Sequence, residues 1–81
     1  MMRYYFDLRE GSDLAVDEEG SQFLSVEAAQ EEAALSLANM ARDAVTGIFS
    51  GSCQPMQVEV RDERGPLFQL GFDFGLRMSR H

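Results

Sequence analysis

The chain has 81 residues, of which 44% are hydrophobic and 26% charged, and its formal net charge is −7. A chain of this length has room for one hydrophobic core, so we expect a single domain spanning residues 1–81. Fourteen acidic residues face seven arginines, and lysine is absent. Nucleic acids and anionic membranes bind proteins through clustered positive charge, so neither is an expected partner.

The compartment is predicted from two further features. The start of the chain, Met1 to Asp7, lacks the apolar core and small-residue cleavage site of a signal peptide, and no apolar run approaches the roughly 18 residues of a membrane span. The single cysteine, Cys53, cannot form an intrachain disulfide and fits a reducing compartment. We therefore expect a cytoplasmic protein.

The first predicted element is a hairpin. Tyr4, Phe6 and Leu8 alternate with polar or amphipathic neighbours, which is the period-2 pattern of a strand with one buried face. Residues 10–12 turn the chain, and residues 13–17 are predicted to return as a short second strand. Residues 18–21 then break away from it.

A helix is predicted from Ser25 to about Gly47. Ser25 is a suitable N-cap because its hydroxyl can accept a hydrogen bond from an amide of the first turn. At about 100° per residue, one stripe of the helix is apolar and rich in alanine, which allows close approach to a sheet. Leu35 projects on the opposite side. The stripe comprises Val26, Ala29, Ala33, Leu37, Met40, Ala41, Ala44 and Ile48.

A second hairpin is predicted between Met56 and Met78, with a turn at residues 62–65 in which Gly65 favours positive φ. Its first strand points Met56, Val58 and Val60 inward. The inward residues of its last strand are Phe68, Leu70, Phe72, Phe74, Leu76 and Met78. That strand spans about twelve residues against about six in its partner. The overhang needs another neighbour, either the first strand of the same chain or the same segment of a second copy.

These elements predict an α+β fold of order ββαββ, a four-stranded antiparallel sheet with one helix packed across one face. The other face is expected to be half polar. Such a face is either simply solvated or, where Tyr5 is expected beside Gly71, a shallow docking site. Its predicted members are Tyr5, Asp7, Arg9, Gln57, Glu59, Arg61, Gln69 and Asp73.

No catalytic constellation emerges from the sequence. Cys53 has no base near it in the sequence, and the only histidine, His81, is the last residue. Serine-based catalysis lacks a histidine or lysine partner for the same reason. We therefore predict a protein that is not an enzyme.

The densest acidic cluster comprises Asp13, Asp17, Glu18 and Glu19. It does not match the spacing of a calcium loop, and transition metals would need histidines or paired cysteines. The cluster is interpreted as a hydrated polar turn, with cation binding left open. No metal or other cofactor is predicted.

Four segments together resemble a family of short bacterial proteins classed as a domain of unknown function. They are the opening Arg3-Tyr-Tyr-Phe-Asp-Leu-Arg-Glu-Gly11, the turn Asp17-Glu-Glu-Gly20, the helix with Ser25-x-x-Ala-Ala at its start and Met40-Ala-Arg-Asp43 near its end, and the hairpin Val58-Glu-Val-Arg-Asp-Glu-x-Gly65. The resemblance implies the fold and a bacterial cytoplasmic setting. It implies no active site, and family members usually carry histidine at the position of Asp7.

Two functions remain open. The first is a non-catalytic interaction or regulatory module that binds a protein partner or itself as a homodimer, because two hairpins and a helix offer surfaces rather than a deep pocket. The alternative is a binder of an aromatic small molecule between subunits, with Tyr5, Phe72 or Phe74 stacking on the ligand. The candidate interaction surface comprises Tyr5, Leu35, Phe72, Phe74, Leu76 and Met78.

Overall fold

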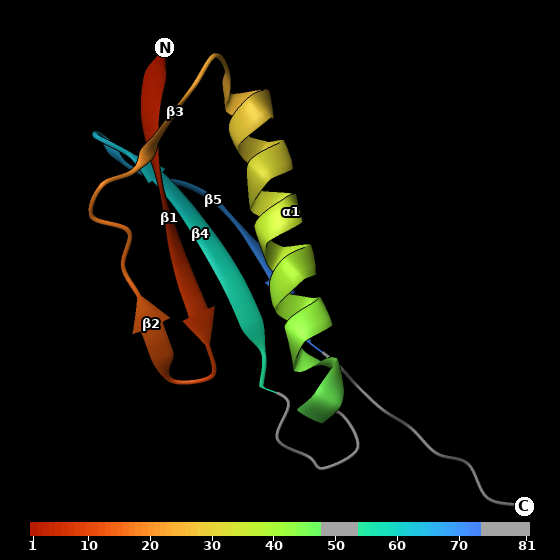
Figure 1. The fold of residues 1–81 in the computed structure, drawn as a ribbon. Helices are drawn as coiled ribbons and strands as arrows, with labels where there is room; N and C mark the ends of the chain where they lie inside the picture. Colours follow the sequence, from red (N-terminus) through yellow and green to blue (C-terminus); the bar gives the residue numbers. More distant parts are fainter. Residues whose placement is uncertain (48–53, 74–81) are drawn as a thin grey trace, which may run out of the picture.

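The computed structural model describes residues 1–47 and 54–73 (Figure 1). In chain order, the described elements are β1 (Met2–Glu10), β2 (Asp13–Ala15), β3 (Ser21–Phe23), α1 (Val26–Ala44), a 3₁₀ turn (Val45–Gly47), β4 (Met56–Asp62) and β5 (Gly65–Phe72).

The strands form one antiparallel sheet in the order β2-β1-β4-β5, and β3 also pairs with β1. Helix α1 lies across one face of this sheet (Figure 1). The predicted α+β fold with a helix packed on an antiparallel sheet is confirmed. The structure adds the short strand β3, in a segment where the sequence predicts that the chain leaves the sheet.

The pairing of β1 with β4 decides which side chains face the helix. Phe6 lies opposite Val60, and Leu8 lies opposite Val58, so the apolar residues of the two strands share one face. Successive side chains alternate between faces, and the intervening polar residues therefore share the other. The inward sets predicted for these two strands are confirmed.

The core is centred on β4 beneath the alanines of α1. Val58 and Val60 are fully buried, and Ala29 and Ala33 of the helix are fully buried with them. Since an alanine side chain is a single methyl group, the helix axis can approach the sheet closely. The remaining helix residues packed against this cluster are Leu37 and Met40.

The start of α1 is fixed by the predicted cap and by an aromatic contact. The Ser25 hydroxyl accepts a hydrogen bond from the Ala28 amide at 3.2 Å. Just before it, the Phe23 ring lies 5.6 Å from the Phe6 ring and 6.1 Å from the Tyr4 ring, in edge-on or tilted geometry. These contacts hold β3 and the first turn of the helix against β1.

Strand β5 differs from the prediction in length and in neighbours. It ends at Phe72, and Asp73 lies outside any strand. Strand β1 does not lie next to β5, because β4 separates the two. The described part of β5 therefore does not pair with β1, and the two alternatives for the overhang remain predictions. The predicted continuation through Phe74, Leu76 and Met78 lies outside the described residues, as does Ile48.

The close approach of α1 makes a prediction about helix volume. Replacing Ala33 by leucine (A33L) places three extra carbons in a fully buried contact. We expect a loss of about 1–3 kcal/mol in the free energy of unfolding. Thermal unfolding should show it as a drop in Tm of about 4–8 °C per kcal/mol. The matched control is A34L, because Ala34 is the next residue and is exposed. Equal Tm values for the two variants would contradict the packing described here.

Candidate functional site

The face of the sheet opposite α1 carries a connected polar cluster built from Asp7, Asp17 and Arg61. Asp7 and Arg61 project from β1 and β4, where Asp7 lies opposite Glu59 and Tyr5 lies opposite Arg61. Asp17 comes from the connection between β2 and β3. We call these three residues, together with Tyr5 and Gly20, the open-face cluster.

The cluster depends on an interruption of the edge strand. Strands β2 and β3 both pair with β1, with Ala15 opposite Leu8 and Ser21 opposite Tyr4. Five residues, 16–20, therefore span the length of only three residues of β1, from Tyr5 to Asp7. β2 and β3 are thus two halves of one edge strand with a two-residue excess between them. Figure 1 shows this connection bowing away from β1.

At the interruption, the Asp17 side chain takes the place of the hydrogen-bond partner that a continuous edge strand would offer to β1. Its Oδ2 accepts a hydrogen bond from the Phe6 amide of β1 at 3.1 Å. Its Oδ1 accepts from the amides of Glu19 at 3.3 Å and Gly20 at 3.0 Å. The Asp17 amide donates in turn to Asp7 Oδ1 at 2.9 Å. One carboxylate thus shapes the turn and satisfies a strand amide that the interrupted edge strand leaves unpaired.

Arg61 joins the other members. Its Nε donates to Asp7 Oδ2 at 2.9 Å, and its Nη2 donates to the Asp17 carbonyl oxygen at 2.9 Å. The guanidinium carbon also lies 4.5 Å from the centre of the Tyr5 ring. The Arg61 side chain is 31% exposed and that of Asp7 13% exposed. A planar guanidinium suits this combination of two donated bonds and a ring contact.

Gly20 closes the turn in a conformation that other residues rarely adopt. Its φ is +71°, and a Cβ built there lies 2.9 Å from both the Tyr4 carbonyl oxygen and Tyr5 Cε1. The turn therefore needs glycine both for its backbone angle and for the space against β1.

The electrostatics of the cluster favour fixed charges. Burial by itself raises the pKa of Asp17. The hydrogen bonds from the Gly20, Phe6 and Glu19 amides and the charge of Arg61 lower this pKa by more, so the net value lies below the usual 3.8. The hydrogen bond to Asp7 raises the pKa of Arg61 above its usual value, although burial opposes the shift. These groups stay ionised near neutral pH, and they are engaged with one another. The arrangement supports structure rather than proton transfer.

The comparisons with known proteins can be set against this geometry. The sequence model of a protein family, described as "Domain of unknown function (DUF6894)", matches residues 3–73. The chain belongs to the DUF6894 family. Comparison with curated proteins gave no match, and neither did comparison with solved structures. The resemblance to a family of unknown function is thereby confirmed, and the matched range contains all members of the open-face cluster.

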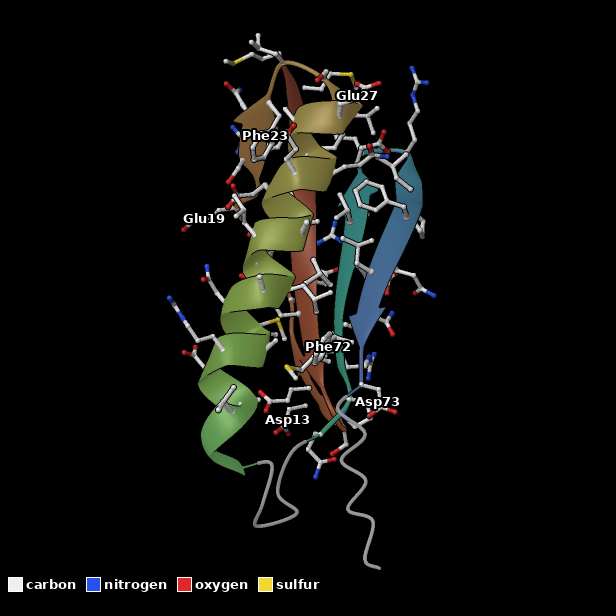
Figure 2. All side chains as sticks on the ribbon, turned by 90° about the vertical axis from the view of Figure 1, so that its right-hand side faces the viewer. Asp13, Glu19, Phe23, Glu27, Phe72 and Asp73 are labelled. Carbon is white, nitrogen blue, oxygen red and sulfur yellow. The ribbon has the colours of Figure 1, made fainter. Side chains whose placement is uncertain are left out.

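Three of the predicted site residues of this DUF6894 chain are described by the structure, and they lie apart from one another. Tyr5 lies on the open face, whereas Phe72 lies opposite the buried Met56 and thus on the helix side, as Figure 2 also shows. Leu35 is 59% exposed on α1, as predicted. The expected Tyr5–Gly71 neighbourhood is wrong, because Gly71 pairs with Gln57, which lies opposite Arg9. Phe74, Leu76 and Met78 lie outside the described residues, as do Cys53 and His81.

Two surface hollows are the candidates for a ligand site. One, of about 300 Å³, is lined by Met1, Met2, Arg3, Gln22, Asp62, Glu63 and Arg64. The other, of about 290 Å³, is lined by Leu8, Glu10, Asp13, Leu14, Ala15 and Met40. Both volumes are at the small end for ligand pockets, and neither hollow includes Tyr5, Leu35 or Phe72.

Among residues 1–47 and 54–73, no three His, Cys, Asp or Glu side chains converge closely enough to hold a metal ion. The only α-helix in those residues, α1, is not long and apolar enough to cross a lipid bilayer.

The sequence interpretation missed the open-face cluster, although it contained two signals. Aspartate at the first position and glycine at the fourth, as in Asp17–Gly20, is a turn signature, and the sequence predicts a hydrated polar turn there without assigning hydrogen bonds to Asp17. Asp7 and Arg61 were both placed on the open face. Their pairing depended on the β1–β4 register, which alternation alone does not specify.

Gly20 provides a test of the turn. We expect Gly20→Ala to destabilise the DUF6894 chain by about 1–3 kcal/mol, because the added methyl group meets the β1 backbone and the φ angle is strained. The measurement is urea unfolding followed by circular dichroism. The control is Gly71→Ala, whose added Cβ meets only the Met56 carbonyl oxygen at 3.8 Å. If both variants unfold at the same urea concentration, the turn does not constrain this position.

Asp17 provides a test by pH. Because its pKa is lower in the folded chain than in the unfolded chain, its ionised form adds stability that is complete above pH 3.8 and disappears as the pH falls through the folded value. Asp17→Asn leaves only one side-chain acceptor oxygen, so we expect a loss of about 1–2 kcal/mol at pH 7. Its free energy of unfolding should also fall less than that of the parent chain between pH 5 and pH 2.

The control for Asp17→Asn is Glu18→Gln, which removes the same charge from the adjacent exposed residue. We expect this variant to keep the pH profile of the parent chain. Parallel profiles for Asp17→Asn and the parent chain would show that the Asp17 carboxylate does not stabilise the turn.

Proposed function

We propose that this chain is a non-catalytic interaction module that self-associates through the outer edge of β5. The observation that carries the proposal is an edge of eight residues, Gly65 to Phe72, without a single charged side chain. Within the described part of the chain, β5 pairs with β4 alone. An exposed strand edge offers backbone N–H and C=O groups to any further strand. Figure 2 shows β5 at the rim of the sheet.

The opposite edge of the sheet is less suitable. It is formed by β2 and β3, which have three residues each and are separated by the Asp17 turn. A short, interrupted edge is one of the ways in which proteins prevent strand pairing. Strand β5 is therefore the better docking edge of the two.

Charge favours β5 as the surface on which two copies can meet. With a net charge of −7, two copies repel each other over most of their surfaces. Strand β5 is a place where they can meet without bringing like charges together. Its apolar residues Phe68 and Leu70 are only partly buried by α1, so pairing could bury them further.

The non-catalytic part of the proposal rests on the open-face cluster. Its carboxylates and guanidinium are engaged in hydrogen bonds that hold the turn to the sheet. If these side chains broke their hydrogen bonds to bind or react with a substrate, the turn that holds the edge strand to the sheet would lose its contacts. We place the protein in the bacterial cytoplasm, in line with its single cysteine and the sequence resemblance.

The test is the solution mass by light scattering over a concentration series. The parent chain is expected to show the mass of a dimer at high concentration. The double variant Gln69→Glu/Gly71→Glu adds two negative charges to the exposed positions of the β5 edge, so we expect its mass to be that of a monomer.

The matched control is Leu35→Glu/Ala38→Glu, which adds the same charge at exposed positions of α1. We expect this variant to remain dimeric. A parent chain that is monomeric at every concentration would overturn the proposal. A control that dissociates while the β5 variant stays dimeric would move the interface to the helix.

A further inference from the structure

We infer that two copies pair their β5 strands antiparallel about a twofold axis at Leu70, with Phe68 opposite Phe72 of the second copy. This inference rests on the proposed self-association and specifies its register. It produces one continuous sheet with the strand path β2-β1-β4-β5-β5-β4-β1-β2 across both copies.

Only part of β5 is suited to pairing with another strand. Its register with β4 shifts between Val60 and Arg61, because Val60 lies opposite Phe68 whereas Arg61 lies opposite Pro66. Leu67 is therefore an extra residue in a bulge. A bulge twists an edge away from a flat partner, and proline lacks an amide to donate. The first three residues of β5 are thus protected, and pairing is confined to residues 68–72.

This remaining segment of β5 is self-complementary. Residues 68–72 read Phe-Gln-Leu-Gly-Phe, with phenylalanine at both ends and leucine in the centre. In an antiparallel pair centred on Leu70, each Phe68 faces Phe72, and each Gln69 faces Gly71. Cross-strand aromatic pairs are favourable, and the long glutamine side chain meets a residue that has no side chain.

The apolar side chains of this segment lie on one face of the sheet. Phe68, Leu70 and Phe72 lie opposite Val60, Val58 and Met56, which are buried on the helix side. A twofold axis perpendicular to the sheet keeps the helix side of both copies on the same face. The three apolar residues of each copy then form one row across the junction, between the two α1 helices. Register and burial therefore agree.

The register can be tested by disulfide cross-linking of the full chain in a Cys53→Ser background. Gln69→Cys and Gly71→Cys are mixed in equal amounts and oxidised, and the products are separated on a non-reducing gel. Both positions are exposed, and a Cβ at position 71 meets only the Met56 carbonyl oxygen at 3.8 Å. Directly opposite residues of antiparallel strands have Cα atoms about 4.5–5.5 Å apart, within the range of a disulfide.

We expect a cross-linked dimer in the mixture and its loss when either variant is oxidised alone. Leu70→Cys alone should also cross-link, since it faces itself across the axis. Phe68→Cys alone is the control, because its two copies are offset by four residues, or about 13 Å, along the strand. Circular dichroism confirms that each variant is folded.

The outcomes separate this inference from the proposed function. If light scattering shows a dimer but Gln69→Cys and Gly71→Cys do not cross-link in the mixture, the register is wrong and self-association stands. Efficient cross-linking of Phe68→Cys alone would likewise overturn the register. If the parent chain is a monomer at every concentration, both proposals fail.

Discussion

The packing of α1 on β4 is the contact on which the rest of the structure depends. Val58 and Val60 are fully buried beneath Ala29 and Ala33, and other apolar residues gather around these four. Small helix residues bring the helix close to the sheet, so that β-branched side chains of one central strand can be covered. A core of this size leaves a small margin of stability, as expected for a chain of this length.

The open face supplies a second set of constraints by polar means. Asp17 lies where two excess residues interrupt the edge strand. Its carboxylate accepts the hydrogen bond from the Phe6 amide that a neighbouring strand would otherwise accept. Arg61 then joins β4 to this turn and to Asp7 of β1. Three segments that are distant in sequence are thus connected on a face where the apolar core gives no help.

These two layers of contacts shape the functional interpretation. The ionisable groups that lie together on the open face form hydrogen bonds that hold the edge strand. The two edges of the sheet are also unequal. One is short and interrupted, whereas the other is eight residues long and uncharged. Our proposal therefore places self-association at the longer edge, as a closed twofold pair rather than an open chain of subunits.

The sequence by itself determined the helix and the strands other than β3, the inward residues of β1, β4 and the described part of β5, the Ser25 cap and the exposure of Leu35. Each follows from local periodicity or from a capping preference that acts over a few residues. It also determined family membership, because the matched motifs lie along the chain. Only the tertiary structure decided the strand order, the return of Ser21–Phe23 to the sheet and the separation of Tyr5 from Gly71. These features depend on the register between strands far apart in sequence, and alternation of side chains is equally compatible with several registers. The Asp7–Arg61–Asp17 cluster follows from the same register, which is why its members were visible in the sequence and their association was not.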